Sequence, residues 1–335
     1  MRVAFVAPGG LGTPTGGYVY DRHAVEALRR RHEVELVTVP PRASGVFEAV
    51  RLSCRSRRGF DVVVQDALCA EVLAPVNPTL GVPVVGIVHL LAKDDPREGA
   101  VSRATDTAYL GTLDSCVYTS RATARSSPSK TDSVVAHPAS RFSPDVTERE
   151  VRRKARREGL HVAFVGDISP VKGLDRLVRA VSEVPECTVT VAGRVADRRY
   201  LRRVRRLCSA LGVPDRVEFV GVLSRDGLVS VFGEADAVAV PSRHEAFGTA
   251  YIEGMSFGLP AVAPASGGAD ELIEDGKNGF LVRDDTDLVR ALRTLTEDDF
   301  LARAGVEALE AERDWVSWEG TTRKVVEHVE RTAKG

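Results

Sequence analysis

Two glutamates separated by seven residues, Glu245 and Glu253, have the spacing that most clearly suggests chemistry in this sequence. The surrounding residues predict a strand that ends at Val240, a polar turn, and a helix that begins near 247–249 and stops at Gly258. Backbone N–H groups are unpaired at a helix N-terminus, which therefore suits a phosphate. The two carboxylates flank this predicted anion site, where they would accept hydrogen bonds from hydroxyl groups.

The elements that must position these side chains are short apolar strands alternating with amphipathic helices. The expected strands comprise residues 3–7, 34–39, 62–65, 84–88, 116–119, 133–136, 162–165, 188–192, 217–220, 237–240 and 261–263. Continuous apolar strands separated by helices indicate parallel sheets that are covered on both faces. In the helix expected at 18–31, Ala24 and Leu28 share the buried face, whereas Asp21 is expected on the polar face.

The strand pattern restarts midway along the chain. Val162-Ala163-Phe164-Val165 echoes Val3-Ala4-Phe5-Val6, and each segment precedes a turn with glycine and a helix. We therefore expect an α/β protein with two Rossmann-like domains. The expected domains are residues 1–145, a connector at 146–160, a second domain at 161–314 and a terminal helix at 315–335.

Composition narrows the class of protein. The 335 residues carry 46 basic and 47 acidic side chains, a net charge of −1, which excludes a nucleic-acid binder driven by overall charge. Residues 1–145 are mildly basic, with 17 basic and 15 acidic side chains, whereas residues 161–335 are acidic, with 23 and 29. The sequence has no run of apolar residues long enough to span a membrane, and its first apolar residues are interrupted too soon for us to expect a signal peptide. Five scattered cysteines indicate neither disulfides nor zinc, so we expect a cytoplasmic protein.

Several motifs in order resemble those of retaining glycosyltransferase family four, which has the GT-B fold and an E-x7-E motif. Glu245 and Glu253 lie in a Ser-x-x-Glu-x-Phe-Gly context that continues to Glu-Gly-Met and Gly-x-Pro. The other matching segments are residues 164–174, 265–273 and 275–282, Gly16-Gly17 before a helix, and His89 after a strand. The resemblance covers essentially the whole chain, and it implies two domains that face a central cleft, with residues 1–145 on the acceptor side and residues 161–314 binding the nucleotide-sugar donor. It also implies a terminal helix that crosses back to the first domain.

The resemblance implies a role for each matching residue. Glu245, His89 and Lys172 would be catalytic, with Glu245 and His89 at the donor sugar and Lys172 at the leaving diphosphate. Glu253 would hold the ribose hydroxyls of the nucleotide. The other expected substrate-binding residues are Gly16, Gly17, Ser169, Arg194, Phe247, Gly248, Thr249 and Ala250.

The sequence departs from the family pattern at two places. Asp167 stands where the family commonly has a basic residue, so we expect it to point away from the diphosphate or to cap the following turn. Arg194 is a candidate to replace the missing charge. Residues 136–140, Ala-His-Pro-Ala-Ser, stand where the family usually has Pro-Asn-Gly-Val-Asp.

The resemblance also implies a mechanism and partners. A hexose-type sugar would pass from a nucleotide sugar, with UDP-sugar favoured, to an acceptor with retained configuration, and neither a cofactor nor a metal is expected. The acceptor, a small molecule, glycan or lipid-linked sugar, stays open, as do the donor nucleotide and the oligomeric state. Gln65-Asp66 and the segment 89–95 are candidates for the acceptor side. Arg29-Arg30-Arg31 with Arg51, Arg55, Arg57 and Arg58 could contact a membrane surface peripherally.

Three alternative functions remain. An NAD-dependent oxidoreductase is disfavoured, because Gly10-Leu11-Gly12 is followed by no third glycine of the fingerprint, and Val39-Pro40-Pro41 offers no acidic residue at the second strand. A nucleotide-sugar epimerase or phosphorylase on the same fold is the second alternative. A degenerate protein that binds nucleotide sugar without turnover is the third, and Asp167 is the residue that favours it.

Overall fold

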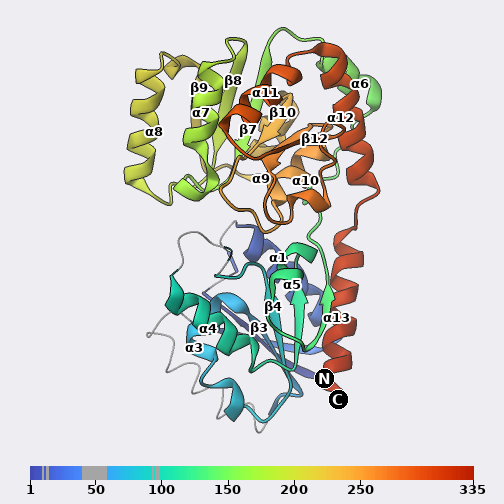
Figure 1. Cartoon of the computed structure of the whole chain (residues 1–335). Helices are drawn as coiled ribbons and strands as arrows, with labels where there is room; N and C mark the ends of the chain where they lie inside the picture. Colours follow the sequence, from blue (N-terminus) through green and yellow to red (C-terminus); the bar gives the residue numbers. More distant parts are fainter. Residues whose placement is uncertain (10, 13–14, 40–58, 93, 95–98) are drawn as a thin grey trace. The chain divides into compact units, whose positions relative to one another are not determined.

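The computed structural model describes residues 1–9, 11–12, 15–39, 59–92, 94 and 99–335, which form two compact units (Figure 1). Unit 1 comprises Met1–Pro138 together with Val316–Gly335, and unit 2 comprises Ala139–Trp315. The first segment of unit 1 therefore ends at Pro138, and the segment 146–160, which the sequence suggested as a connector, lies in unit 2. Its helix α6 (Glu148–Lys154) begins at a capping box between Thr147 and Glu150 and packs against α12 (Asp298–Arg313).

Unit 1 is built on a six-stranded parallel sheet with the strand order β2-β1-β3-β4-β5-β6. Its strands are β1 (Arg2–Ala7), β2 (Glu33–Thr38), β3 (Val62–Asp66), β4 (Val84–Val88), β5 (Ser115–Tyr118) and β6 (Asp132–Val135). Its helices are α1 (Gly16–Arg29), η2 (Ala67–Cys69), α3 (Ala70–Leu73), η3 (Asn77–Thr79), α4 (Ala100–Leu110), α5 (Arg121–Ser126) and α13 (Trp318–Ala333). Strands β1, β3, β4 and β5 are almost fully buried, as expected for a parallel sheet with helices on both faces.

Unit 2 repeats this architecture with the strand order β12-β11-β10-β7-β8-β9, again all parallel. Its strands are β7 (Leu160–Val165), β8 (Cys187–Ala192), β9 (Val217–Gly221), β10 (Ala237–Ala239), β11 (Ala261–Pro264) and β12 (Gly279–Val282). Its other helices are η4 (Pro170–Lys172), α7 (Leu174–Ser182), α8 (Arg198–Ala210), η5 (Pro214–Arg216), α9 (Arg225–Glu234), α10 (Thr249–Met255), η6 (Ala269–Glu271) and α11 (Asp285–Leu295). The expected strands all form, and β12 is an additional one that pairs with β11.

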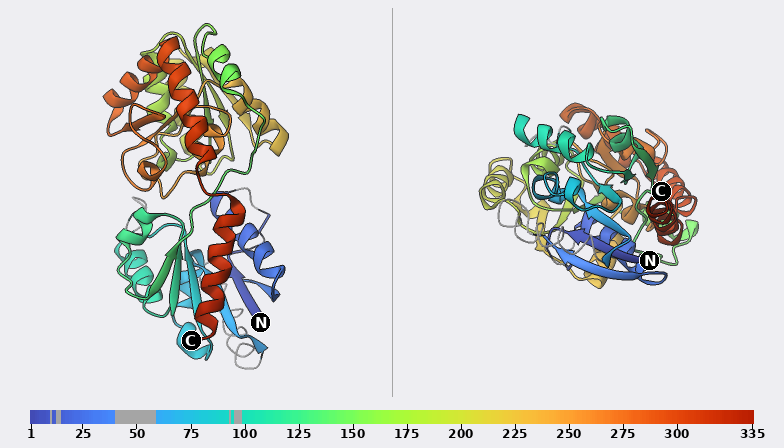
Figure 2. Two further views of the ribbon diagram at one scale, coloured as in Figure 1. Left: turned by 90° about the vertical axis from the view of Figure 1, so that its right-hand side faces the viewer. Right: turned by 90° about the horizontal axis from the view of Figure 1, so that it is seen from below.

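The terminal helix α13 packs in unit 1, along α1 (Figure 2). The indole of Trp318 stacks on the ring of His23 with centroids 4.0 Å apart, and Thr321 Oγ1 donates to the His137 carbonyl oxygen at 2.6 Å. Val325 and Val329, one turn apart, are fully buried in the core of unit 1. About twenty residues at the end of the chain therefore complete the first unit.

Two details differ from the sequence-based expectations. The helix expected over 284–312 is two helices, α11 and α12, separated at Thr296-Glu297. Asp21, expected on the polar face of α1, is fully buried together with Ala24, Val25 and Leu28. In the described part of the chain, no helix has the length and apolar character needed to cross a membrane.

Candidate functional site

The strand order of unit 2 reverses between β7 and β10, and ligands of open α/β sheets bind at such a point, outside the carboxyl ends of the strands. The loop after β7 carries Lys172, and the loop after β10 carries Glu245. The two side chains meet there, because Lys172 Nζ donates to Glu245 Oε2 at 2.6 Å. Ser242 Oγ donates to the same carboxylate oxygen at 3.1 Å. Both charged groups are partly accessible, with 28% of the Lys172 side chain and 11% of the Glu245 side chain exposed.

Glycines fix the backbone that carries Glu245. Gly267 pairs with Glu245 in an isolated β-bridge and has a φ of +93°, and a Cβ at Gly267 would lie 1.8 Å from the Glu245 carbonyl oxygen. Gly268 N–H donates to that carbonyl oxygen at 3.0 Å. Gly248 has a φ of +89°, and a Cβ there would lie 2.3 Å from the Tyr251 ring. Only glycine fits these positions, so the Gly267-Gly268 pair of the sequence has a structural role in holding Glu245.

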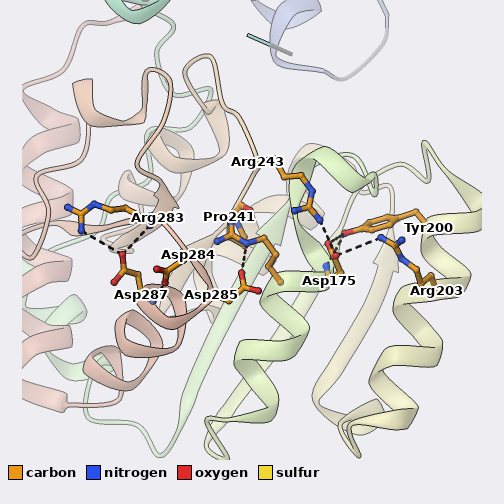
Figure 3. Close-up of polar contacts among 10 residues, drawn as sticks. Asp175, Tyr200, Arg203, Pro241, Arg243, Arg283, Asp284, Asp285 and Asp287 are labelled. Atoms are coloured by element: carbon orange, nitrogen blue, oxygen red, sulfur yellow. Dashed lines mark hydrogen bonds and ion pairs between the residues drawn. The ribbon is translucent and has the colours of Figure 1, made fainter. Parts of the chain in front are cut away.

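Ion pairs tie the two loops together on the side shown in Figure 3. The Asp175 carboxylate, in the first turn of α7, accepts a hydrogen bond from Arg243 at 3.2 Å and one from the Tyr200 hydroxyl. Arg176 Nη1 donates to the Pro241 carbonyl oxygen at 3.1 Å, while its Nε binds Asp285. These contacts hold the start of the Glu245 loop against the helix that follows Lys172.

Glu253 lies one turn inside α10 and is almost fully buried, with 3% of its side chain exposed. Arg141 donates from Nε to Glu253 Oε1 and from Nη2 to Glu253 Oε2, the second at 2.8 Å. Burial raises the pKa of Glu253, and the Arg141 guanidinium opposes that rise. Sequence reasoning missed Arg141. The signal that could have found it is an arginine directly after residues 136–140, where the sequence departs from the family pattern.

Asp167 has a partner that the sequence did not predict. Its carboxylate accepts hydrogen bonds from Arg194, Nη2 to Oδ2 at 2.6 Å and Nε to Oδ1 at 3.3 Å. The expected turn cap is not seen, because Ser169 rather than Asp167 precedes η4. Asp167 therefore partly neutralises the cation that was the candidate to replace the missing basic residue.

The other predicted residues of unit 2 cluster near the same loops. Ser169 is buried at the start of η4, and Thr249 and Ala250 open α10, which has only seven residues. The Phe247 side chain is buried, and the centroid of its ring lies 5.8 Å from that of the Trp315 ring. Phe247 thus packs in the core of unit 2, and only its backbone is available for the expected role.

The predicted residues of unit 1 also gather at a strand-order reversal, between β1 and β3. Gly16 and Gly17 open α1, and His89 directly follows β4. A Cβ at Gly17 would lie 3.5 Å from His89 Cδ2, so the two residues are neighbours. His89 Nε2 lies 3.2 Å from Asp21 Oδ1. Unit 1 therefore brings the glycine turn and the histidine together, with Asp21 as an unforeseen partner.

The structure describes only some of the other residues that were expected on the acceptor side or at a membrane surface. Asp66 ends β3 and is buried, and its Oδ1 accepts from the Leu68 N–H at 2.9 Å. Arg31 forms an ion pair with Glu330 of α13 at 3.2 Å. Residues 93 and 95 and the arginines at 51, 55, 57 and 58 lie outside the described residues.

One acidic pair with Asp-x-Asp spacing, Asp285 and Asp287, was not recognised in the sequence (Figure 3). Asp285 binds Arg176 Nε at 2.6 Å. Asp287 lies 3.2 Å from Arg290 Nη1 and 3.7 Å from Arg283 Nη1. Both carboxylates lie in the first turn of α11 and form ion pairs with arginines. Positively charged neighbours disfavour the binding of a divalent cation.

Part of this chain is similar in sequence to known glycosyltransferases. Residues 147–310 match the family model of glycosyl transferases group 1. The D-inositol 3-phosphate glycosyltransferase of Mycobacterium leprae (strain Br4923) is 39% identical over 166 residues, which cover 47% of this chain and 38% of that protein. The protein of the same name from Mycolicibacterium smegmatis is 42% identical over 123 residues, 36% of this chain and 28% of that protein. The match thus spans 38% or less of the length of these curated relatives.

Solved structures resemble this one over nearly its full length. Sucrose-phosphate synthase from Thermosynechococcus elongatus has a TM-score of 0.85 at 20% identity, covering 98% of each chain. HepE from Anabaena, in complex with UDP and glucose, has a TM-score of 0.80 at 19% identity, covering 99% of this chain and 100% of that one. At such identities the likeness shows the fold alone. The chain has the two-domain, Rossmann-like GT-B fold, which confirms the fold class predicted from its sequence.

Proposed function

We propose that this chain is a retaining glycosyltransferase that moves a hexose-type sugar from a UDP-sugar to a hydroxyl group of an acceptor. The observation that carries the proposal is the contact between Lys172 and Glu245 at the switch point of the second sheet. A cation suited to a diphosphate and a carboxylate suited to sugar hydroxyls lie side by side there, with Glu253 nearby on α10. The match of residues 147–310 to glycosyl transferases group 1 supports the same activity.

Each residue has a proposed task. Lys172 and the backbone amides of 247–250 hold the diphosphate, with Ser169 and Arg194 beside them. Glu245 accepts hydrogen bonds from the sugar hydroxyls, and Glu253 accepts them from the ribose. An ammonium group has three donors, so Lys172 can keep Glu245 as a partner while it binds a phosphate oxygen. In unit 1, His89 meets the sugar, and Gly16-Gly17 lets the backbone approach the ligand.

The reaction follows from these roles. The bond between the anomeric carbon and the β-phosphate oxygen breaks, and its electron pair goes to that oxygen. The acceptor hydroxyl attacks from the same face, and its proton passes to the departing phosphate. The negative charge that develops on the diphosphate is stabilised by Lys172 and the fixed backbone amides, and this electrostatic effect is the main contribution to catalysis. We propose that no bound divalent cation is needed, since fixed charge supplies this stabilisation.

The donor and acceptor are proposed at different levels of detail. HepE was crystallised with UDP, with UDP-glucose, and with UDP and glucose, which supports a UDP-sugar as donor here. The acceptor is a small molecule, a glycan or a lipid-linked sugar. The curated relatives act on D-inositol 3-phosphate by name, which makes a phosphorylated polyol the first small molecule to test.

A two-stage experiment tests the proposal. The melting temperature is measured with UDP, GDP, ADP and their sugars, with and without EDTA, and the best donor is then incubated with an acceptor library. We expect UDP-sugar to stabilise the protein in EDTA, and nuclear magnetic resonance to show a product with the anomeric configuration of the donor. Inverted product, or equal transfer by the wild type and Glu245→Ala, would overturn the proposal. Binding without transfer would favour a degenerate binding protein, and an epimerised sugar would favour an epimerase.

A further inference from the structure

Three polar side chains of unit 1 meet at the carboxyl ends of its central strands. Asp21 lies in α1, Asp66 is the last residue of β3, and His89 follows β4. One polar atom from each side chain lies within 4.8 Å of the other two. Asp21 and Asp66 are 0% and 1% exposed, whereas 16% of the His89 side chain is exposed. We refer to these residues as the Asp21–Asp66–His89 cluster.

Within the described residues, the hydrogen bonds of the cluster leave one oxygen of each carboxylate without a partner. Asp21 Oδ1 lies 3.2 Å from His89 Nε2, and Asp66 Oδ1 accepts from the Leu68 N–H at 2.9 Å. The remaining Oδ2 atoms of both aspartates are buried and unpaired when both groups are ionised. An unpaired buried carboxylate oxygen is costly, and two adjacent buried carboxylates disfavour ionisation of both. A single proton held between the two side chains satisfies both oxygens.

We propose that Asp21 and Asp66 share one proton, and that this acid–carboxylate pair fixes the orientation and the tautomer of His89. In this arrangement neutral His89 donates from Nε2–H to Asp21 Oδ1, and its Nδ1 keeps a lone pair. The two aspartates are thus positioning residues. Their role in transfer rests on the proposed function, in which the Nδ1 atom accepts a hydrogen bond from a hydroxyl of the donor sugar.

The surroundings of the cluster favour this protonation state. Burial raises the pKa of Asp21 to about 7, and burial together with the charge of Asp21 raises that of Asp66 to about 8. Burial lowers the pKa of His89, although the Asp66 charge opposes this. The other titratable neighbours are Tyr20, Cys69 and Tyr109, and burial raises the pKa of each, so they stay neutral. In the described part of the chain, neither lysine nor arginine forms an ion pair with the cluster.

Packing restrains the imidazole ring as well. The Tyr20 ring meets the His89 ring edge to face, with centroids 5.3 Å apart, and the Tyr20 hydroxyl is itself fixed by donating to the Ala136 carbonyl oxygen at 2.9 Å. Gly17 lies against the Cδ2–Nε2 edge of the ring. Nε2 is therefore the inner nitrogen, engaged by Asp21. No hydrogen bond among the described residues uses Nδ1, so Nδ1 is the nitrogen that can meet a hydroxyl.

The test reads the tautomer directly, by ¹⁵N resonance of labelled histidine in the full chain without substrate. We expect the Nε2–H tautomer in the wild type and in Asp66→Asn, since the asparagine amide copies the protonated carboxyl group. Asp21→Ala should lose the tautomer preference and lower kcat/KM on the order of 10- to 100-fold, whereas Asp21→Asn, whose amide oxygen still accepts from Nε2–H, should rescue both. An Nδ1–H tautomer in the wild type would overturn the proposal.

A stability measurement tests the shared proton separately. The folded pair keeps a proton at pH values where the unfolded aspartates have lost theirs, so stability should fall as pH rises from about 4 to about 8. Asp66→Asn should flatten this slope, and the control Asp61→Asn, an exposed aspartate of the same unit, should not. An unchanged slope in Asp66→Asn, or one equivalent of Zn²⁺ or Mn²⁺ bound by the wild type and lost in Asp66→Asn, would overturn the proposal.

The tautomer and the pH dependence of stability are measured without substrate, so these two readouts stand even if the proposed transfer activity fails. If the tautomer and the slope behave as expected in a protein without transferase activity, the proposed function fails and the shared proton remains. If transfer is found and Asp21→Ala transfers as fast as the wild type, the positioning role fails.

Discussion

Arg141 binds both carboxylate oxygens of Glu253, although the two residues are 112 positions apart in the sequence. The guanidinium is partly exposed and the carboxylate is almost fully buried, so Arg141 supplies most of the compensation for a charge that has left water. The backbone of Arg141 is itself held by Arg225, whose guanidinium donates to the Arg141 carbonyl oxygen at 2.9 Å. The carboxylate proposed to bind ribose is therefore held in place before any nucleotide arrives.

Replacing Arg141 with alanine should destabilise unit 2 by about 3–5 kcal/mol at neutral pH, because Glu253 is left as an uncompensated buried charge. Urea unfolding followed by circular dichroism measures the loss. The double variant Arg141→Ala/Glu253→Gln should recover much of it, since the neutral amide needs no counter-ion. A double variant as unstable as the single one would argue against this account.

The same variant should show an altered dependence of stability on pH. Without Arg141, burial is opposed only by the charge of Arg225, the last and smallest of the causes that act on the pKa of Glu253, so the folded carboxyl group keeps its proton above the usual pKa of 4.5. The unfolded state then binds fewer protons, and stability should fall as pH rises above 4.5 until the folded group ionises. Melting temperatures between about pH 4.5 and 8 test this. Equal slopes for Arg141→Ala and the double variant would contradict it.

Lys172→Ala should lower kcat by about 100-fold, because in the proposed mechanism the departing diphosphate loses the cation that stabilises it. The matched control is Lys277→Ala, since Lys277 is an exposed lysine of the same unit that pairs with Glu274 and Glu307. Initial rates of transfer from the best donor measure the difference. If both lysine variants retain wild-type rates, Lys172 has no role at the leaving group.

Gly267→Ala should cost about 3 kcal/mol of stability and displace Glu245, because the new Cβ meets the Glu245 carbonyl oxygen in a left-handed backbone conformation. Gly276→Ala is the control. Gly276 has a φ of +75° but open space around a Cβ, so only the backbone cost of about 1 kcal/mol applies. Denaturant midpoints compare the two, and equal losses would show that the contact with Glu245 is unimportant.

Transfer activity should survive EDTA, because in the proposed mechanism Lys172 and backbone amides supply the charge that a divalent cation would otherwise provide. The Asp285→Asn/Asp287→Asn variant should behave like the wild type with and without added Mg²⁺, since arginines already engage these carboxylates. The rate is measured after dialysis against EDTA and again after Mg²⁺ is restored. Activity that depends on Mg²⁺ only in the wild type would identify this acidic pair as a metal site.

The sequence by itself determined the two parallel sheets and the loops that carry the candidate site. Buried parallel strands must be apolar along their whole length, so β1, β4, β7 and β8 stand out without any structure. Residues that follow such strands lie at one edge of the sheet, and Glu245 was placed there because it follows a predicted strand. Lys172 and His89 were selected because the segments that carry them resemble the family's motifs. β12 was missed as a strand because its four residues follow a turn-rich segment.

Only the tertiary structure decided which side chains became partners. Arg141 with Glu253, and Arg194 with Asp167, are contacts between distant segments that no local spacing encodes. The burial of Asp21 could not be predicted from local spacing alone, for the same reason. A carboxylate on a helix is expected to face water unless another group compensates for its burial. The spacing of Asp21 from Ala24, Val25 and Leu28 is that of a single helix face, which the expectation of a polar position for Asp21 overlooked. The compensating groups, Asp66 and His89, reach it only when β3 and β4 pack beside α1.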